Sequence, residues 1–549
     1  MMVPFGTTPS DIPSSVVVPE SYLTSFEGAM SDDFTSWLLS ETAFDAQPNK
    51  PKSFTSAKHP LLPEPQCKVV LGEPRRLELL QFLSPDAKSL PELQLKMCNN
   101  YISEYFDTFH PQMPIIHMPT FDPNTAPAPL TLAILAYGSY HKDSSLSQTM
   151  IQNLRWVVFS SPDFEPPVQV WVIQALLLIE VFEKTMASRN LHALAHIFHA
   201  TTLTLLKRGN YFYEVKRINN GDENVLTESI KRVVFAAFLL DASHAAIFGH
   251  SLILSVDELR LNLPCDDSLW DDKAIMKEQP LGFLVALKRA LNRSPVNTNT
   301  FGRFIIIHGM LSVTWHMRQR ERQNSNGVGL GDFKSDWRVQ ISRALEAWIS
   351  HYDKYIQATS TTNILDDYRH CMYHHSCILL SASLIDVQVY AGAKYITGRA
   401  VSESDILRIE TYMQQWAVTV NARWAVVHAA RLLREVLVDG WMAKNDPIMM
   451  RPWGVYHATL VIWSYGFAMS HQPGNEYLLE QPTDLSLAFE HSQPSDREEM
   501  SAQWYIESVS KVADADEIVS IRGLSRTLGV LLKVRGCVAN CWWELRNLL

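Results

Sequence analysis

Residues 231–270 read KRVVFAAFLLDASHAAIFGHSLILSVDELRLNLPCDDSLW, and this stretch predicts how the rest of the chain folds. Its first part, residues 233–240, is apolar on every side, which is typical of a helix buried inside a large fold. Asp241 and a run of small residues follow, and Gly249 is expected to end the helix because glycine tolerates the left-handed cap conformation. Pro264 ends the next segment, just before a cluster of acids.

This stretch resembles the centre of the fungal-specific transcription factor domain, a regulatory region that reads helix, Asp, small residues, Gly and a segment ending in Leu-Pro. The match has the form FxLDAxHAAxFGHS followed by DExRLxLPCDDxLW, which is associated with the subgroup that carries two-Cys two-His zinc fingers. The chain departs from many relatives in lacking a Trp in the helix and in having Ala242 where they have Arg. The resemblance implies an all-α fold, a large multi-helix regulatory domain behind a disordered acidic tail.

Four further segments resemble the same family, in family order. They read YFxxFHPxxPIIHxPTF from residue 105, QALLLxEVFxK with SRxxHxxAHxFH from 174, WAxxxxARxAxxHAxxLL from 416, and PWxxYxAxLVxWxYG from 452. The resemblance implies structural roles for the family-motif positions, which are Phe109, His110, Pro114, His117, Asp241, Gly249, Pro264, Trp416 and Trp453.

The cysteines exclude the usual DNA-binding zinc modules within this chain. Its seven cysteines are scattered and no CxxC occurs, whereas a two-Cys two-His finger or a six-cysteine binuclear cluster needs closely spaced thiolates. An odd, scattered set in a long chain is typical of a reducing compartment. The first fifteen residues do not have the pattern expected of a secretory signal, and no run of eighteen apolar residues predicts a membrane span.

Charge divides the chain into an acidic tail and a nearly neutral body. Residues 1–49 contain seven acids and no Lys or Arg, which leaves a net charge of −3 of the total −10 for the remainder. Such a body has little electrostatic drive toward nucleic acid. We therefore expect no direct DNA binding by this chain. The family's finger either lies in coding sequence upstream of Met1 or has been lost.

Residues 1–66 are rich in Pro, Ser and Thr, which predicts a disordered tail. Residues 67–90 are predicted to be a linker. Within the tail, aromatic and Leu side chains alternate with acids, a pattern typical of transcriptional activation segments that a partner groove captures as a helix. The alternative is a short helix that docks on the chain's own core. The predicted activation residues are Phe34, Trp37, Leu38, Leu39 and Phe44.

Residues 91–549 read as one helical domain with loops near 292–300, 323–336 and 471–500. A single long helix is predicted over residues 414–437. We expect His110 and His117 to be hydrogen-bonded turn residues rather than ligands.

Two clusters have spacing that a metal could use. His192, His196 and His199 share a helix face, but no acid follows His192 as a zinc protease motif requires. Cys371, His374 and His375 also project near one another, without a second ligand pair. We favour helix packing in both places and predict no metal and no cofactor.

Two classes of function remain. The first is a fungal-type RNA polymerase II transcription regulator that lacks its own DNA-binding domain. It would act in the nucleus through co-activators, homo- or hetero-dimerisation, and DNA contacted only indirectly.

The alternative is an all-α enzyme of terpene-synthase type, which would hold magnesium on Asp266, Asp267 and Asp271. That string follows a proline, so a loop is expected there, and no second magnesium motif follows. We therefore expect no enzyme.

Overall fold

The computed structural model describes residues 69–83, 90–209, 211–212, 221–271, 280–325, 336–359, 363–396, 399–437, 440–472, 496–521 and 527–539. These residues are overwhelmingly helical, which confirms the all-α prediction. The only strands in the described parts are β1 (Tyr395–Ile396) and β2 (Arg399–Ala400), which pair antiparallel with Tyr395 opposite Ala400. None of the described helices is both long and apolar enough to cross a membrane.

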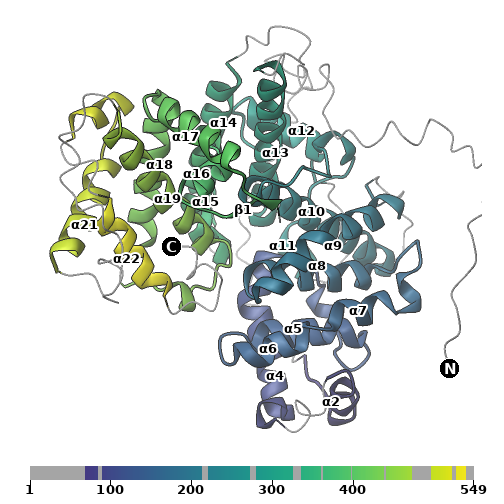
Figure 1. Cartoon of the computed structure of the whole chain (residues 1–549). Coiled ribbons are helices and arrows are strands. Elements are labelled where there is room, and N and C mark those ends of the chain that lie inside the picture. Colours follow the sequence, from purple (N-terminus) through teal and green to yellow (C-terminus); the bar gives the residue numbers. More distant parts are fainter. Residues whose placement is uncertain are drawn as a thin grey trace, which may run out of the picture.

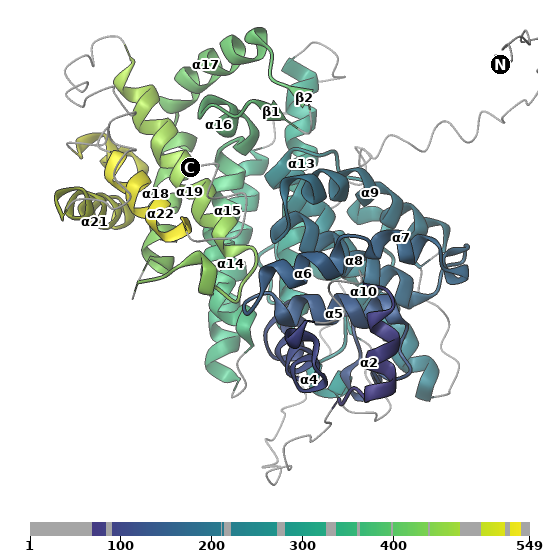
Figure 2. The same cartoon turned by 60° about the horizontal axis from the view of Figure 1, so that its bottom comes forward.

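The molecule has two sides that meet along one long helix (Figures 1 and 2). The earlier helices lie on one side and the later ones on the other, with α13 (Thr300–Ser325) between them. Helix α13 contacts α10 on the first side and α14 and α15 on the second. One continuous apolar core runs through both sides.

Two buried helices form the centre of the first side. They are α8 (Val170–Thr185) and α10 (Gly221–Phe248), and nearly every residue of α8 is buried. Residues 233–238 of α10 are at most 2% exposed, as their all-round apolar character predicts. Gly249 follows with a φ of +76°, and its backbone N–H donates to Ala245 O at 3.2 Å. The predicted glycine stop of this helix is therefore confirmed.

The opening motif forms a sequence of short turns between α4 (Leu95–Glu104) and α5 (Ala128–Ser139). A π-helical turn covers Tyr105–Phe109, and 3₁₀ turns cover His110–Gln112 and Met118–Thr120. The other helices of this side are α2 (Glu73–Leu80), α6 (Ser144–Ile151), α7 (Leu154–Phe159), α9 (Arg189–Arg208), α11 (Asp267–Asp271) and α12 (Phe283–Leu291).

The second side is built on α15 (Arg369–Ser381), α18 (Val420–Val436) and α19 (Arg451–Ser470), which pack against one another. Around them lie α14 (Trp337–Ala358), η8 (Ile364–Tyr368), α16 (Leu384–Tyr390), α17 (Glu403–Ala417), α21 (Asp496–Ser510) and α22 (Leu528–Val538).

The single helix predicted over residues 414–437 is wrong, because the chain breaks between α17 and α18. Thr419 has extended backbone angles, and its hydroxyl accepts from the backbone N–H of Ala422 at 3.2 Å. A Thr at this position caps a new helix rather than continuing the old one, because its side chain satisfies one of the free donors.

The polar loops differ in detail from their predicted limits. Residues 292–299 connect α12 to α13 as expected, but α13 continues to Ser325, past the predicted start at 323. Helix α21 begins at Asp496, inside the predicted 471–500 loop.

Candidate functional site

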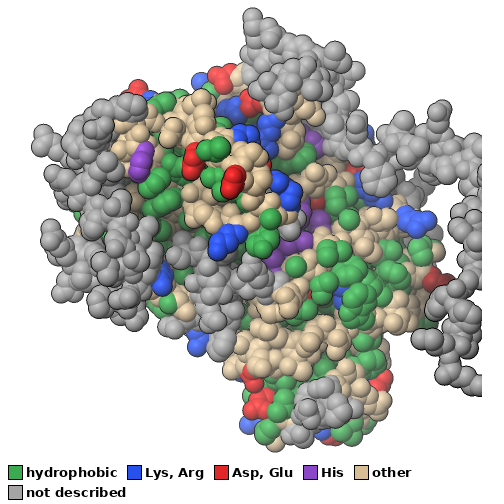
Figure 3. All heavy atoms as spheres, viewed as in Figure 1, with side chains coloured by type: hydrophobic (Ala, Val, Ile, Leu, Met, Phe, Trp, Pro, Cys, Tyr) green, Lys and Arg blue, Asp and Glu red, His purple; other side chains and the backbone are tan. Residues whose placement is uncertain are grey.

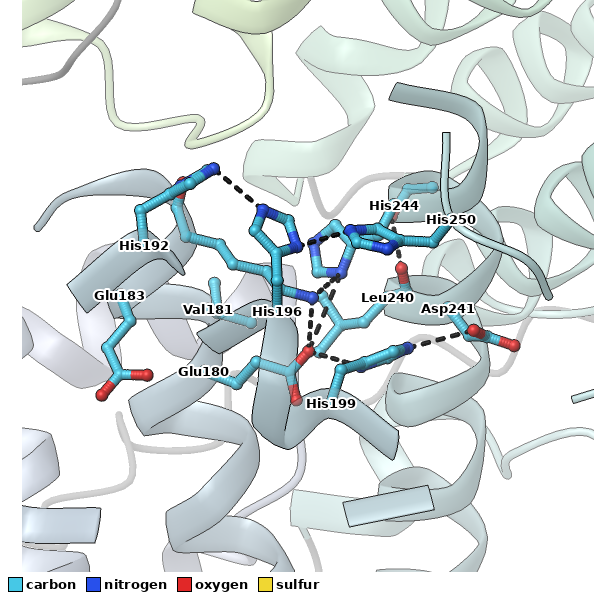
Figure 4. Close-up of polar contacts among 12 residues, drawn as sticks. Glu180, Val181, Glu183, His192, His196, His199, Leu240, Asp241, His244 and His250 are labelled. Carbon is cyan, nitrogen blue, oxygen red and sulfur yellow. Dashed lines mark hydrogen bonds and ion pairs between the residues drawn. The ribbon is translucent and has the colours of Figure 1, made fainter. Parts of the chain in front are cut away.

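Five polar residues of the family motifs meet in the interior between α8, α9 and α10 (Figure 4). His199 lies between two carboxylates, with Nδ1 2.6 Å from Glu180 Oε1 and Nε2 3.0 Å from Asp241 Oδ1. Lys184 Nζ lies 2.9 Å from the same Glu180 oxygen and 2.7 Å from His244 Nδ1. None of the five side chains is more than 6% exposed.

The hydrogen bonds determine the protonation of this cluster. Both ring nitrogens of His199 face carboxylate oxygens, which only accept, so both must carry a proton and the ring is charged. Burial opposes that charge, but Glu180 and Asp241 outweigh it and raise the pKa of His199 above its usual value. Lys184 can only donate, so His244 accepts and is neutral; burial and then Lys184 hold the pKa of His244 well below its usual value. Two carboxylates thus balance two cations.

Asp241 also holds the chain segment that returns after the helix. Its second carboxylate oxygen accepts from the backbone N–H groups of Ile253 and Leu254 at 2.9 and 2.7 Å. The turn at Gly249 brings this segment back, and a β-carbon there would lie 2.8 Å from the side chain of Ile385. The Asp and the Gly of the central motif therefore act together in closing this turn.

The cluster contains a group of ligand type but is not suited to a metal. Side-chain atoms of Glu180, His199 and His244 lie within 4.8 Å of one another, the one such group among the described residues. Lys184 Nζ already bonds to Glu180 and His244, and both nitrogens of His199 are occupied by carboxylates. A metal would have to displace the ammonium and deprotonate His199, so the residues present fit an ion-pair network better.

The three histidines that share a face in sequence separate in the structure. His199 points inward to the carboxylates, whereas His196 lies 2.9 Å from His192 and 2.6 Å from His250 (ring nitrogen to ring nitrogen). His192 Nδ1 donates to the backbone carbonyl of Lys184 at 2.9 Å. Burial, followed by Lys184, lowers the pKa of His196 to about 2 and that of His250 to about 4. Histidine side chains reach the surface over this region (Figure 3).

The histidines of the opening motif have backbone partners. His110 Nε2 lies 2.7 Å from Ile116 O, inside its own turn. His117 Nδ1 lies 2.7 Å from the Thr120 hydroxyl and Nε2 2.8 Å from Trp270 O. This confirms that both are hydrogen-bonded turn residues, and it joins the opening motif to the end of the central one.

The first two acids of the string in the enzyme alternative have separate local partners. Asp266 is exposed and accepts from Ser268 N at 3.0 Å as a local cap. Asp267 lies 3.3 Å from the buried guanidinium of Arg232 and is engaged as an ion pair. Residues 267–271 form the short helix α11 rather than the expected loop, and the side chain of Asp271 lies outside the described set. The terpene-synthase alternative is therefore not supported.

The second ligand-like cluster also separates into pairs. His374 Nδ1 lies 3.0 Å from His428 Nδ1, and His375 Nε2 lies 3.1 Å from His457 Nδ1. Burial holds the pKa of all four histidines below the usual value, to about 2 for His374 and about 3 for His428. Burial also raises the pKa of the Cys371 thiol, so it is not poised to bind a metal as a thiolate.

The remaining motif positions are packing residues. Phe109, Pro114, Pro264, Trp416 and Trp453 are all buried. The indole of Trp416 also donates to the last backbone carbonyl of α15 at 3.0 Å. The predicted activation residues Phe34, Trp37, Leu38, Leu39 and Phe44 lie outside the described residues.

Comparison with known proteins gives one family match, the fungal specific transcription factor domain over residues 102–350. The chain is 25% identical to the zinc finger protein klf1 of Schizosaccharomyces pombe, over 83% of this chain and 67% of that protein. It is 25% identical to the nicotinate catabolism cluster-specific transcription factor of Emericella nidulans, over 79% and 54% of the two chains.

A third relative is the zinc finger protein zas1 of Schizosaccharomyces pombe, again 25% identical, over 78% of this chain and 51% of that protein. The chain thus spans two thirds of the first relative and about half of the other two. No solved structure matches the chain. Residues 102–350 of this chain match the model of the fungal specific transcription factor domain, and the chain is similar over most of its length to two zinc finger proteins and a transcription factor from fungi.

Proposed function

We propose that this chain is the regulatory and activating part of a fungal-type RNA polymerase II transcription regulator. The observation that carries the proposal is the family match over residues 102–350, together with similarity to zinc finger proteins and a transcription factor over most of this chain. The relatives are named as zinc finger proteins and a transcription factor, and those names do not favour a catalytic role.

In this proposal the chain has three parts. Residues 91–549 form the helical regulatory domain, residues 67–90 link it to the tail, and residues 1–66 contact co-activators or the transcription machinery in the nucleus. Two of the three relatives are zinc finger proteins by name, whereas this chain has no CxxC. DNA would therefore be reached through a partner subunit or a finger encoded elsewhere.

A tethering assay tests the tail directly. Residues 1–66 fused to a heterologous DNA-binding domain are expected to activate a reporter. The double substitution Trp37→Ala, Leu38→Ala removes the side chains that a partner groove would bury, so activation should fall to that of the DNA-binding domain alone. The matched double substitution Tyr22→Ala, Leu23→Ala lies in the same tail outside the segment and should leave activation intact.

Two outcomes would contradict the proposal at different points. A silent wild-type tail would remove its activating role. Equal loss in both double variants would place the activity in general hydrophobicity rather than in residues 34–44. Tethering the full chain, with and without residues 1–66, then asks whether the helical domain modulates the tail; identical reporter output from the full chain and the isolated tail would remove the regulatory role.

A further inference from the structure

A small apolar cavity lies beside the buried ion-pair cluster, at the junction between the two sides of the molecule. Its volume is about 90 Å³, and its wall includes Val181 of α8 and Leu240 of α10. Val181 directly follows Glu180 in the sequence, and Leu240 directly precedes Asp241 (Figure 4). The opposite wall comes from α13, η8, α15 and the turn at residues 448–450. An occupant of the cavity would therefore contact residues from both sides of the molecule.

The chemistry of the lining excludes a charged occupant. None of the lining residues is Asp, Glu, Lys or Arg. An ionised ligand placed there would lose its hydration with no counter-charge in the wall, at a cost of several kcal/mol or more. The occupant must therefore be neutral.

Two polar groups in the lining can form a hydrogen bond with an occupant. His308 Nδ1 donates to Phe304 O at 2.7 Å, which leaves Nε2 as an acceptor, and burial lowers the pKa of this ring to about 4. Tyr368 also lines the cavity and is 4% exposed, and a phenol hydroxyl can donate a hydrogen bond. The lining thus offers His308 Nε2 as an acceptor and the Tyr368 hydroxyl as a donor, whereas the Ser243 hydroxyl already donates to the backbone of its own helix.

The wall can adapt to an occupant. Four of its side chains are methionines, namely Met113, Met372, Met449 and Met450. Methionine is flexible and polarizable and is common at surfaces that accept varied ligands. The cavity of about 90 Å³ is smaller than the apolar protein cavity of about 150 Å³ that binds benzene, so a single small ring enters it only when the methionine side chains move aside.

We propose that this cavity binds a small uncharged molecule, a single ring or short chain with one hydroxyl, and that the molecule is an effector of the domain. The ligand hydroxyl would donate to His308 Nε2 and accept from Tyr368. A ligand that fills the junction stabilises the packing of one side against the other by mass action. Binding follows from the cavity alone, whereas the effector role rests on the proposed function.

Phenol is the probe, and toluene and benzoate are its controls. Toluene has the same size without the hydroxyl, and benzoate carries a charge. Thermal unfolding of the full chain, with calorimetric titration, should show concentration-dependent stabilisation that is largest with phenol, smaller with toluene and absent with benzoate. Equal shifts with all three, or none with phenol, would overturn the binding proposal.

Three variants locate the effect. Tyr368→Phe keeps the ring and should lower the phenol shift, which the remaining bond to His308 keeps above the toluene shift, while leaving the toluene shift unchanged. Tyr505→Phe removes a buried hydroxyl without a partner, outside the lining, and should leave both shifts as in the wild type. Ala236→Leu fills the cavity from α10 and should abolish both shifts. Wild-type shifts in a folded Ala236→Leu protein would place the binding elsewhere.

The effector role has its own readout. In vitro transcription with the tethered full chain should change with phenol for the wild type and not for Ala236→Leu. Phenol binding with unchanged transcription would overturn the effector role and leave the cavity site standing. Transcriptional activity without phenol binding would remove the cavity proposal and leave the regulator proposal intact.

Discussion

Replacing Lys184 by Met should be among the most damaging single changes in this chain. The two side chains have similar length, so the change removes the charge rather than the volume. Lys184 Nζ is fully buried and bonds to Glu180 at 2.9 Å and to His244 at 2.7 Å. Without it, the interior holds two carboxylates and a single imidazolium. Leaving one partner of a buried pair uncompensated costs about 3–5 kcal/mol.

Lys207→Met is the matched control. Lys207 also bonds to a glutamate, Glu258, at 2.9 Å, but these side chains are 35% and 39% exposed. Exposed pairs of this kind contribute roughly 0.2–1 kcal/mol because water screens the charges. The two lysines therefore have the same pair distance and differ in burial, which should separate their effects several-fold.

Urea unfolding followed by circular dichroism measures both changes as differences in free energy of unfolding. Adding Glu180→Gln to Lys184→Met removes the uncompensated carboxylate and should recover part of the loss, which a double-mutant cycle quantifies. The reasoning fails if Lys184→Met costs no more than Lys207→Met, or if the second substitution adds to the loss in full. Either result would mean that the cluster is not a charge-balanced unit.

Four further predictions concern packing, a buried charge and pH. Gly138→Ala would place a β-carbon 1.8 Å from the backbone oxygen of Tyr101 and should destabilise the protein by roughly 1–3 kcal/mol or more. The control is Gly536→Ala, where a β-carbon would have nothing within 4 Å. In the same urea titration this control should be neutral or slightly stabilising. Arg232→Met removes a fully buried guanidinium 4.5 Å from the ring of Trp270 and should cost about 3–5 kcal/mol; a loss comparable to that of an exposed pair would contradict its role. The free energy of unfolding should fall as the pH is lowered from 7 to 4, because the neutral buried histidines take up protons only on unfolding. Each proton taken up lowers the free energy of unfolding by about 1.4 kcal/mol per pH unit. A flat profile would contradict this prediction. His199 has the opposite sign: its raised pKa contributes stability below its unfolded pKa of roughly 6.5 that is lost as pH rises through the folded value, so His199→Gln should flatten stability on the alkaline side.

Local patterns predicted much of the fold. The all-round apolar run of α10 and the glycine after it determine a buried helix and its stop, because each depends on neighbours only a few residues away. The sequence also predicted that His110 is hydrogen-bonded within its own turn, because a turn between prolines places the imidazole ring near the backbone of that turn. The break at Thr419 was missed although Thr is a good capping residue, because the apolar residues on either side have helical spacing.

The arrangement of the charged cluster and the cavity came only from the tertiary structure. Sequence spacing placed His199 with His192 and His196, yet its ring nitrogens bond to acids on α8 and α10. The pairing of carboxylates with cations depends on the relative orientation of three helices about their axes. Helical periodicity in the sequence does not determine that orientation. The cavity likewise depends on residues from 112 to 450 that are distant in sequence. The sequence alone therefore determined most of the helices and the family resemblance, because those follow from short-range pattern, whereas long-range packing decided which buried groups compensate one another.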